Sequence, residues 1–180
     1  MTRATIYAVT DKEVISSTEF NGDGYPTGYG IFYIEMLEKI KGVNDFITIV
    51  QTFNNNIFNY GGKVIYYENR KKFFNVKGLM DMCGVGKKGY FDLYFSDWIF
   101  IKNLTDKPFG IKTREIDSDG KGAPPELIIL HPMEQVALNF GSIEGNFKSV
   151  QECCDAHNME KGDGGVTTLV RKIVLDSIEK

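Results

Sequence analysis

The residues best suited to metal chemistry in this sequence are its cysteines and histidines. Cys153 and His157 are four positions apart, so they would share one face of a helix, and Cys154 lies beside them. Thiolate and imidazole groups bind zinc, and Cys83 offers a further ligand. Against this, the sequence has no Cys-x-x-Cys pair, and free cysteines are commonly small buried apolar residues. We therefore expect buried cysteines, and neither a metal nor a cofactor.

A nucleophilic dyad between Cys83 and a histidine is the main enzymatic alternative. His131 follows a short apolar run and has Glu134 close to it in the sequence. A dyad requires the thiol and the imidazole to meet in space, and nothing in their spacing predicts such a meeting. The acidic residues of the C-terminal third show no spacing typical of a glycosidase or a two-metal site. The residue pattern thus predicts a protein that is not an enzyme.

A glycine-rich segment over residues 20–30 precedes a predicted helix, and its backbone N–H groups are suited to binding a phosphate. The glycine spacing does not match the dinucleotide-binding fingerprint, and the Lys-Ser or Lys-Thr pair of a P-loop is missing. The other interpretation is a tight turn, in which Gly24 supplies a positive φ and Pro26 fixes the chain. We favour the turn. The candidate residues of this loop are Asp23, Gly24, Tyr25 and Pro26.

Charge is unevenly distributed along the chain, whose net charge is −3. Residues 63–88, the basic segment, carry seven bases and two acids, a net charge of +5. Residues 113–163, the acidic segment, carry ten acids and four bases, a net charge of −6. Both are either solvated surface or the electrostatic footprint of a charged partner.

Aromatic residues alternate with cations in the basic segment. Cations contact phosphates and aromatic rings stack on bases, so this composition is suited to nucleic acid. The alternative places the aromatic side chains in the core and leaves residues 70–72 as a solvated turn. The residues that we expect to contact a partner or nucleic acid are Tyr67, Arg70, Lys71, Lys72, Phe74, Lys87 and Lys88.

The elements that position these residues are strands and helices in mixed order. Alternating apolar residues predict strands over 5–9, 13–18, 63–68, 90–95, 98–103, 109–116 and 127–130. The first two form an opening hairpin, and residues 90–103 form a second hairpin that turns at Ser96 and Asp97. Helical spacing predicts helices over 31–40, 45–53, 75–83, 147–157 and 166–178.

Two of these helices carry more specific expectations. Asn44 is expected to cap the second helix, whose inward residues are Phe46, Ile49, Val50 and Phe53. The last helix carries one apolar stripe, formed by Val166, Leu169, Val170, Ile173, Val174 and Ile178.

The elements together predict an α+β fold. It has an antiparallel sheet of hairpins with helices packed on one face, followed by a C-terminal strand-helix-helix segment. Residues 1–116 form the core domain in this reading, and residues 117–180 form an acidic linker and helical segment docked on that core. The boundary follows residues 117–125, which are rich in glycine, proline and aspartate.

Composition places the chain among globular proteins. It has 180 residues, of which 42% are hydrophobic and 25% charged, values ordinary for a folded soluble domain. Its apolar runs fall far short of the roughly 20 residues that a membrane span needs, and its first residues carry no signal-peptide core. Three cysteines, two of them adjacent, suggest no disulfide framework, so we expect a cytoplasmic protein.

A resemblance adds to this reading. Arg3, the Asp-Gly-Tyr-Pro-Thr-Gly-Tyr-Gly element over residues 23–30, and the aromatic hairpin over 90–103 with Trp98 are carried in this sequence. In these features the chain resembles a widespread group of small uncharacterised proteins of bacteriophages and mobile elements. The resemblance covers residues 1–105. It departs at Asn21 and Gly22, where that group often has an aromatic residue.

The resemblance implies a viral or mobile-element origin and therefore the cytoplasm of a host bacterial cell. Small proteins of that kind are often counter-defence factors, including anti-CRISPR proteins. The expected function is binding and inhibition of a host CRISPR effector ribonucleoprotein without catalysis, through the acidic or the basic segment. The alternatives are a small-ligand or nucleotide binder that acts as a signal sponge, a nucleic-acid-binding protein, and an enzyme that acts on nucleic acid or a nucleotide. No membrane partner is expected, and the oligomeric state is open.

Overall fold

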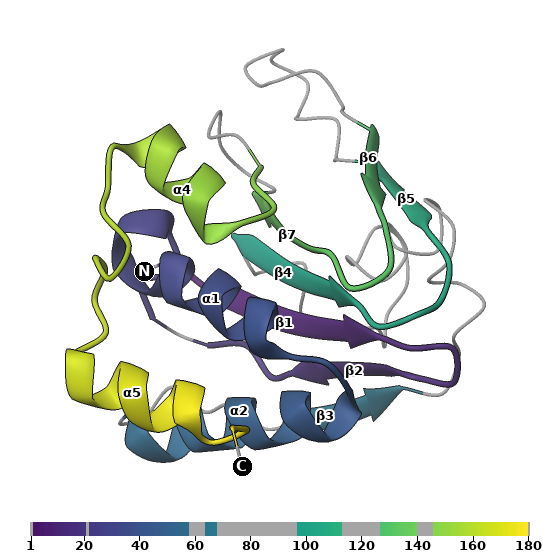
Figure 1. The fold of residues 1–180 in the computed structure, drawn as a ribbon, viewed down its shortest axis with the longest axis horizontal. Helices are drawn as coiled ribbons and strands as arrows, with labels where there is room; N and C mark the ends of the chain where they lie inside the picture. The colour runs from purple at the N-terminus through teal and green to yellow at the C-terminus, as the bar shows by residue number, and fades with distance from the viewer. Residues whose placement is uncertain are drawn as a thin grey trace.

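The computed structural model describes residues 2–20, 22–57, 64–67, 97–112, 127–139 and 146–179. A five-stranded sheet in the order β3-β2-β1-β4-β7 forms its centre (Figure 1). Its strands are β1 (Ala4–Val9), β2 (Val14–Ser17), β3 (Val64–Tyr67), β4 (Trp98–Asn103) and β7 (Gln135–Asn139). Strands β5 (Phe109–Lys112) and β6 (Leu127–Leu130) pair antiparallel in a separate two-stranded sheet.

One pairing of the central sheet is parallel. β1 runs beside β4 in the register Ala4 with Trp98 through Val9 with Asn103, whereas β2, β3 and β7 each pair antiparallel. The predicted α+β class is confirmed, as is the opening hairpin of β1 and β2 beside the strand at 98–103. The sheet is nonetheless mixed, not wholly antiparallel, and the predicted partner strand at 90–95 lies outside the described residues. Because β1 and β4 are parallel, the loops that follow Val9 and Asn103 lie at the same end of the sheet.

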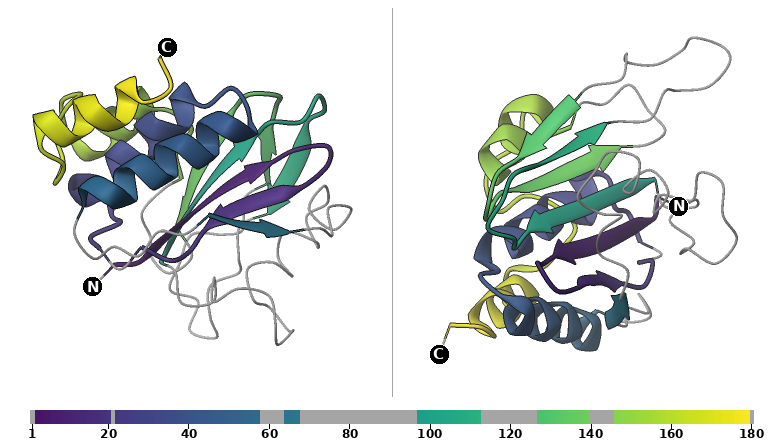
Figure 2. Two further views of the ribbon diagram at one scale, coloured as in Figure 1. Left: turned by 90° about the horizontal axis from the view of Figure 1, so that it is seen from below. Right: turned by 90° about the vertical axis from the view of Figure 1, so that its right-hand side faces the viewer.

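The helices cover one face of the central sheet, as Figure 2 shows. A short π-helical turn, η1 (Pro26–Gly30), leads into α1 (Ile31–Lys39), which is followed by α2 (Val43–Asn56). α4 (Val150–His157) packs against α1, and α5 (Thr168–Asp176) packs against both α1 and α2. All residues of α1 from Ile31 to Leu37 are buried, because this helix lies between the sheet and the other helices.

Strand alternation explains how the core forms. On β1 the side chains of Ala4, Ile6 and Ala8 belong to the helix-facing core, together with Trp98 and Phe100 of β4. The intervening β1 residues are buried too, so neither face of this strand lies open to solvent. Four aromatic rings complete the centre of the core, with Phe53 in edge contact with Phe20 and Tyr33 at centroid distances of 5.4 and 5.6 Å, and Tyr33 in edge contact with Phe100.

The start of α2 differs from the sequence prediction. The expected inward residues Phe46, Ile49, Val50 and Phe53 are buried, which confirms that face. The cap, however, is Gly42 and not Asn44. Asp45 sits in the first turn, and its Oδ2 accepts a hydrogen bond of 2.9 Å from the backbone N of Lys41, which stabilises the same helix end.

The C-terminal helices have side-chain caps. The Ser149 hydroxyl accepts a hydrogen bond from the N of Glu152 at the start of α4, and Thr167 does the same for Val170 at the start of α5. The Glu152 carboxylate accepts from the N of Lys148, the residue before the cap, and so satisfies a further backbone donor at this helix end. Buried residues of this region, among them Val150, Cys153, Val166 and Val174, share the core with β1 and α1.

Candidate functional site

Several backbone N–H groups of the glycine-rich loop donate hydrogen bonds to backbone carbonyls of the protein itself. The N of Gly24 donates to the Thr2 carbonyl at 2.9 Å, the N of Tyr29 donates to the Asp23 carbonyl at 2.7 Å, and the N atoms of Gly28 and Gly30 donate to the Tyr25 carbonyl. These four donors therefore do not point at a ligand in this conformation. The Asp23 side chain is exposed, Tyr25 is half-buried and Pro26 is buried.

The reason for glycine at position 24 differs from the prediction. Among the described glycines, Gly162 and Gly164 have a positive φ, and Gly24 does not. A Cβ at Gly24 would instead lie 2.8 Å from the Cβ of Ala4, closer than real side chains approach. Glycine is needed there because the loop packs directly onto β1.

The loop is also fastened to the C-terminal third of the chain. The N of Gly165 donates to the Gly28 carbonyl at 2.9 Å, and Gly164 approaches the same carbonyl with a φ of +111°. The segment before α5 thus rests on the end of η1.

Cys153, Cys154 and His157, which the structure describes, form no reactive group with one another. Cys153 and Cys154 are buried, and burial raises the pKa of Cys153 to about 12 and raises that of Cys154 as well. Both thiols are therefore protonated at neutral pH and poor nucleophiles or ligands. His157 Nδ1 lies 2.9 Å from the Cys153 carbonyl oxygen and 3.9 Å from its Sγ.

Of the hypothetical dyad between Cys83 and a histidine, the structure describes His131 but not Cys83. His131 is exposed, and its backbone N donates to Glu134 Oε2 at 2.8 Å. Cys83, its proposed partner in a dyad, lies outside the described residues. Within the described ranges, no group of three His, Cys, Asp or Glu side chains is placed to hold a metal ion.

The basic segment is described only at β3. The backbone of Tyr67 pairs with Val14 of β2, and β3 forms one edge of the central sheet. The other residues that we expect to contact a partner lie outside the described residues: Arg70, Lys71, Lys72, Phe74, Lys87 and Lys88.

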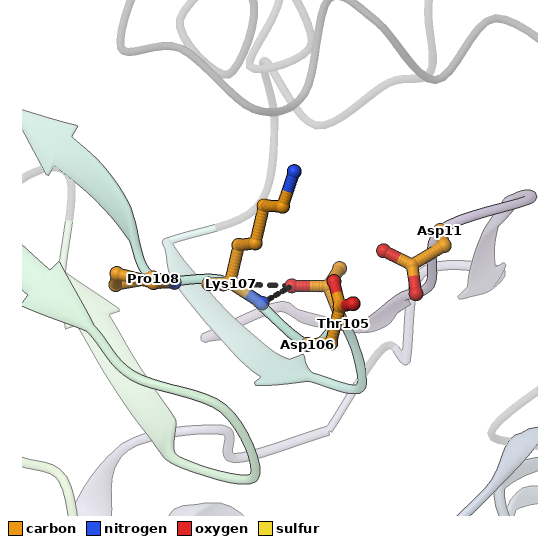
Figure 3. Close-up of a pocket in the computed structure, with 5 residues that line it drawn as sticks. All are labelled: Asp11, Thr105, Asp106, Lys107 and Pro108. Atoms are coloured by element: carbon orange, nitrogen blue, oxygen red, sulfur yellow. Dashed lines mark hydrogen bonds between the residues drawn. The ribbon is translucent and has the colours of Figure 1, made fainter.

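A depression opens beyond the carboxyl ends of the neighbouring strands β1 and β4. It has a volume of about 620 Å³. Asp11, in the turn after β1, faces the loop after β4, from which the Lys107 side chain extends (Figure 3). Among the described residues, those that line it are Asp11, Thr105, Asp106, Lys107 and Pro108. Sequence analysis missed this site, because the two loops meet only through the parallel pairing of strands that are far apart in the sequence.

The outer face of α5 is a second surface that sequence analysis did not identify. The predicted apolar stripe divides between two sides of this helix. Val174 is fully buried, whereas Leu169 is 68% exposed and Ile173 is 40% exposed. Leu169 and Ile173 are four positions apart, so they lie together on the outside of α5, beside the Lys172–Asp176 ion pair at 2.7 Å.

Comparison of the chain with protein-family models, with curated proteins and with solved structures found no match. None of the helices in the described part of the chain is both long enough and apolar enough to cross a membrane.

Proposed function

We propose that the protein is a counter-defence protein of a bacteriophage or mobile element, which binds and inhibits a host CRISPR effector nuclease without catalysing a reaction. The observation that supports a binding function is the exposed apolar pair Leu169 and Ile173 on α5. Large apolar side chains exposed side by side are typical of protein interaction sites. An apolar pair at i and i+4 is also how a helix anchors in a partner's groove.

The helix is held firmly enough to present this pair. Its inner side is fixed by buried Val174 and by an ion pair between Arg171 and Glu35 of α1. Charged side chains border the apolar pair, among them Lys172 and Asp176. An apolar centre with a polar rim is the usual composition of a protein interface.

The kind of partner rests on the resemblance carried by Arg3 and by residues 23–30. The acidic residues of this protein also favour a nuclease effector as the partner. Such effectors bind nucleic acid through basic surfaces, and an acidic face complements a basic surface. Four acidic residues of the acidic segment are exposed on α4 and the loop after it: Glu152, Asp155, Glu160 and Asp163.

Co-purification with CRISPR effector complexes tests the proposal. The wild-type protein is expected to co-purify with an effector ribonucleoprotein and to reduce its cleavage of target DNA. The double variant Leu169→Glu/Ile173→Glu is expected to fold normally and to lose most of both activities. Thr48→Glu on α2, an exposed position on a neighbouring helix, serves as the matched control. Failure of the wild-type protein to bind any effector would overturn the proposal, and full inhibition by the double variant would remove α5 from the interface.

A small-ligand binder is the second candidate, and the depression at Asp11 and residues 105–108 favours it. Its volume falls in the range of roughly 300–1,000 Å³ typical of ligand pockets. A nucleotide that raises the melting temperature of the protein, with no effector bound at all, would favour this candidate. The two carboxylates against one lysine make this lining better suited to a cationic group than to a phosphate.

A further inference from the structure

We infer that the depression between the turn after β1 and the loop after β4 receives an arginine side chain of the partner protein. The inference rests on the proposed function in one respect, namely that the partner is a protein. The cavity, its charges and its place in the sheet carry the rest.

The position of the depression follows from the parallel pairing. β1 and β4 run side by side and end together, at Val9 and Asn103. Ligands commonly bind just beyond the carboxyl ends of parallel strands, where the backbone turns away and leaves a crevice between two loops. In this protein, Asp11 follows one strand, and residues 105–108 follow the other.

Within the part of the chain that the structure describes, the lining combines three charged groups with an apolar surface. Asp11 contributes a carboxylate on one side, and Asp106 and Lys107 contribute a carboxylate and an ammonium group on the other (Figure 3). An arginine guanidinium offers five N–H donors in one plane and pairs with carboxylates through two parallel hydrogen bonds. Pro108 offers an apolar surface for the aliphatic part of the side chain. The Lys107 ammonium group can then donate to a backbone carbonyl or a carboxylate of the partner that lies beside the arginine.

The two loops are fixed before any ligand arrives. Thr10 Oγ1 donates to the Glu13 carbonyl at 2.8 Å and accepts from the N atoms of Lys12 and Glu13. The N of Leu104 donates to the Val9 carbonyl at 2.7 Å, which joins one loop to the other. The aspartates are therefore carried on loops that need little ordering, and this lowers the entropic cost of binding.

Buried Asn103 holds the second loop. Its Nδ2 donates to the carbonyls of Lys107 and Leu130, and its Oδ1 accepts from both the N and the Oγ1 of Thr105. These polar groups are satisfied within the protein. The side chains of Asp106 and Lys107 are exposed and pair with no other described residue, so they are accessible to a partner. A phosphate would meet two carboxylates at this site, which disfavours it relative to a guanidinium.

Binding of short peptides tests the inference without any effector. The probes are acetylated and amidated Gly-Arg-Gly, with Gly-Lys-Gly and Gly-Gln-Gly for comparison, and the readout is the amide NMR spectrum of the full chain. The arginine peptide is expected to shift the amides of Asp11, Asp106 and Lys107 and to bind more tightly than the other two, because only a guanidinium pairs bidentately with carboxylates.

Variants locate the site. Asp11→Asn/Asp106→Asn is expected to bind the arginine peptide about tenfold more weakly or worse, since two charge-assisted contacts are lost. Lys107→Gln is expected to bind it more tightly, because a repelling charge is removed. Asp97→Asn, at a half-exposed aspartate just before the other end of β4, is the matched control and should bind within about twofold of wild type, since an asparagine oxygen can still accept from the N of Arg3.

The outcomes separate this inference from the proposed function. Unchanged affinity in the double variant, or peptide shifts away from the two loops, overturns the inference whatever the partner is. Arginine binding as expected, with no effector ever co-purified, supports the depression as an arginine site and counts against the CRISPR effector. Loss of effector binding in Asp11→Asn/Asp106→Asn, but not in Asp97→Asn, supports both.

Discussion

Arg171 of α5 reaches Glu35 of α1, with 3.4 Å between its Nε and the carboxylate Oε2. The two side chains are only 12% and 10% exposed. The guanidinium also lies over the Phe32 ring, 5.4 Å from its centroid, and its Nη2 donates to the Asp163 carbonyl at 3.1 Å. Burial raises the pKa of Glu35, although Arg171 acts in the opposite direction. One arginine therefore joins α5, α1 and the loop between α4 and α5.

Arg171→Ala should loosen α5 from the core. Removing one partner of a largely buried ion pair leaves the other charge uncompensated, which costs about 3 kcal/mol. We expect the free energy of unfolding, measured with urea, to fall by an amount of that order. Lys172→Ala is the matched control, because Lys172 is exposed and pairs only along the surface of the same helix. Equal effects in the two variants would contradict the role given to Arg171.

The buried amine of Lys102 gives a pH prediction. Lys102 is 2% exposed, and its Nζ donates to Gln135 Oε1 at 2.9 Å. Burial lowers its pKa from 10.5 to about 8, against the opposing effect of the Glu38 carboxylate. A depressed pKa in the folded state means that folding opposes protonation, so this contribution to stability is present above pH 10.5 and lost as the pH falls through 8.

Lys102→Met should remove that penalty. The wild-type penalty below pH 8 is of the order of 3 kcal/mol, because the pKa falls from 10.5 to about 8 and one pKa unit corresponds to about 1.4 kcal/mol. We expect the variant to gain about 1–2 kcal/mol at pH 7, since Gln135 then loses a hydrogen-bond donor. Its stability relative to wild type should decline between pH 8 and 10.5, as measured by urea unfolding. Lys41→Met, at an exposed lysine, should show neither effect.

Gly24→Ala tests the packing of the glycine-rich loop on β1. The added Cβ would lie 2.8 Å from the Cβ of Ala4, and Ala4 is held in the sheet by its pairing with Trp98. Overpacking of this kind costs about 1–3 kcal/mol, so the melting temperature should fall. Gly165→Ala is the control, since a Cβ there would make only ordinary contacts, the nearest at 3.6 Å from Tyr29 Cζ. A fully stable Gly24→Ala that loses partner binding would instead make this loop part of the binding site.

Local patterns in the sequence were enough to predict most elements, because alternation and helical spacing are properties of neighbouring residues. The inward face of α2 and the strand from Trp98 to Asn103 are examples. The parallel pairing of β1 with β4 could not be predicted in this way, because it joins segments that lie 94 residues apart, as Ala4 and Trp98 do. The depression at Asp11 depends on that pairing and was missed with it.

The surface of α5 shows a second property that the sequence pattern could not predict, namely how much of an apolar stripe is buried. An apolar stripe predicts that a helix buries some face, but the width of the buried part depends on the layers around it. α5 packs mainly on α1 and α2, so Val174 is covered while Leu169 stays exposed. Close approaches are equally invisible in a sequence, as the contact between Gly24 and Ala4 shows. The turn motif suggests that Gly24 is needed for a positive φ. In the structure, glycine is needed there because a side chain would collide with Ala4.

The basic segment gives the last prediction, which rests on charge alone. Arg70, Lys71 and Lys72 belong to a stretch with a net charge of +5 in a chain with a net charge of −3. If these residues contact the nucleic acid of an effector complex, binding must weaken as salt rises, because condensed counterions are released when phosphates are neutralised. The sequence predicts that these three side chains are exposed, and exposed charges contribute little to folding, so the triple alanine variant should keep the stability of the wild type. It should bind the complex more weakly, and its affinity should depend less steeply on salt, with each lost phosphate contact lowering the slope by about one unit. Titrations at several salt concentrations measure both quantities. Identical affinity and slope in variant and wild type would exclude this segment from the interface and leave the acidic segment as the charged contact.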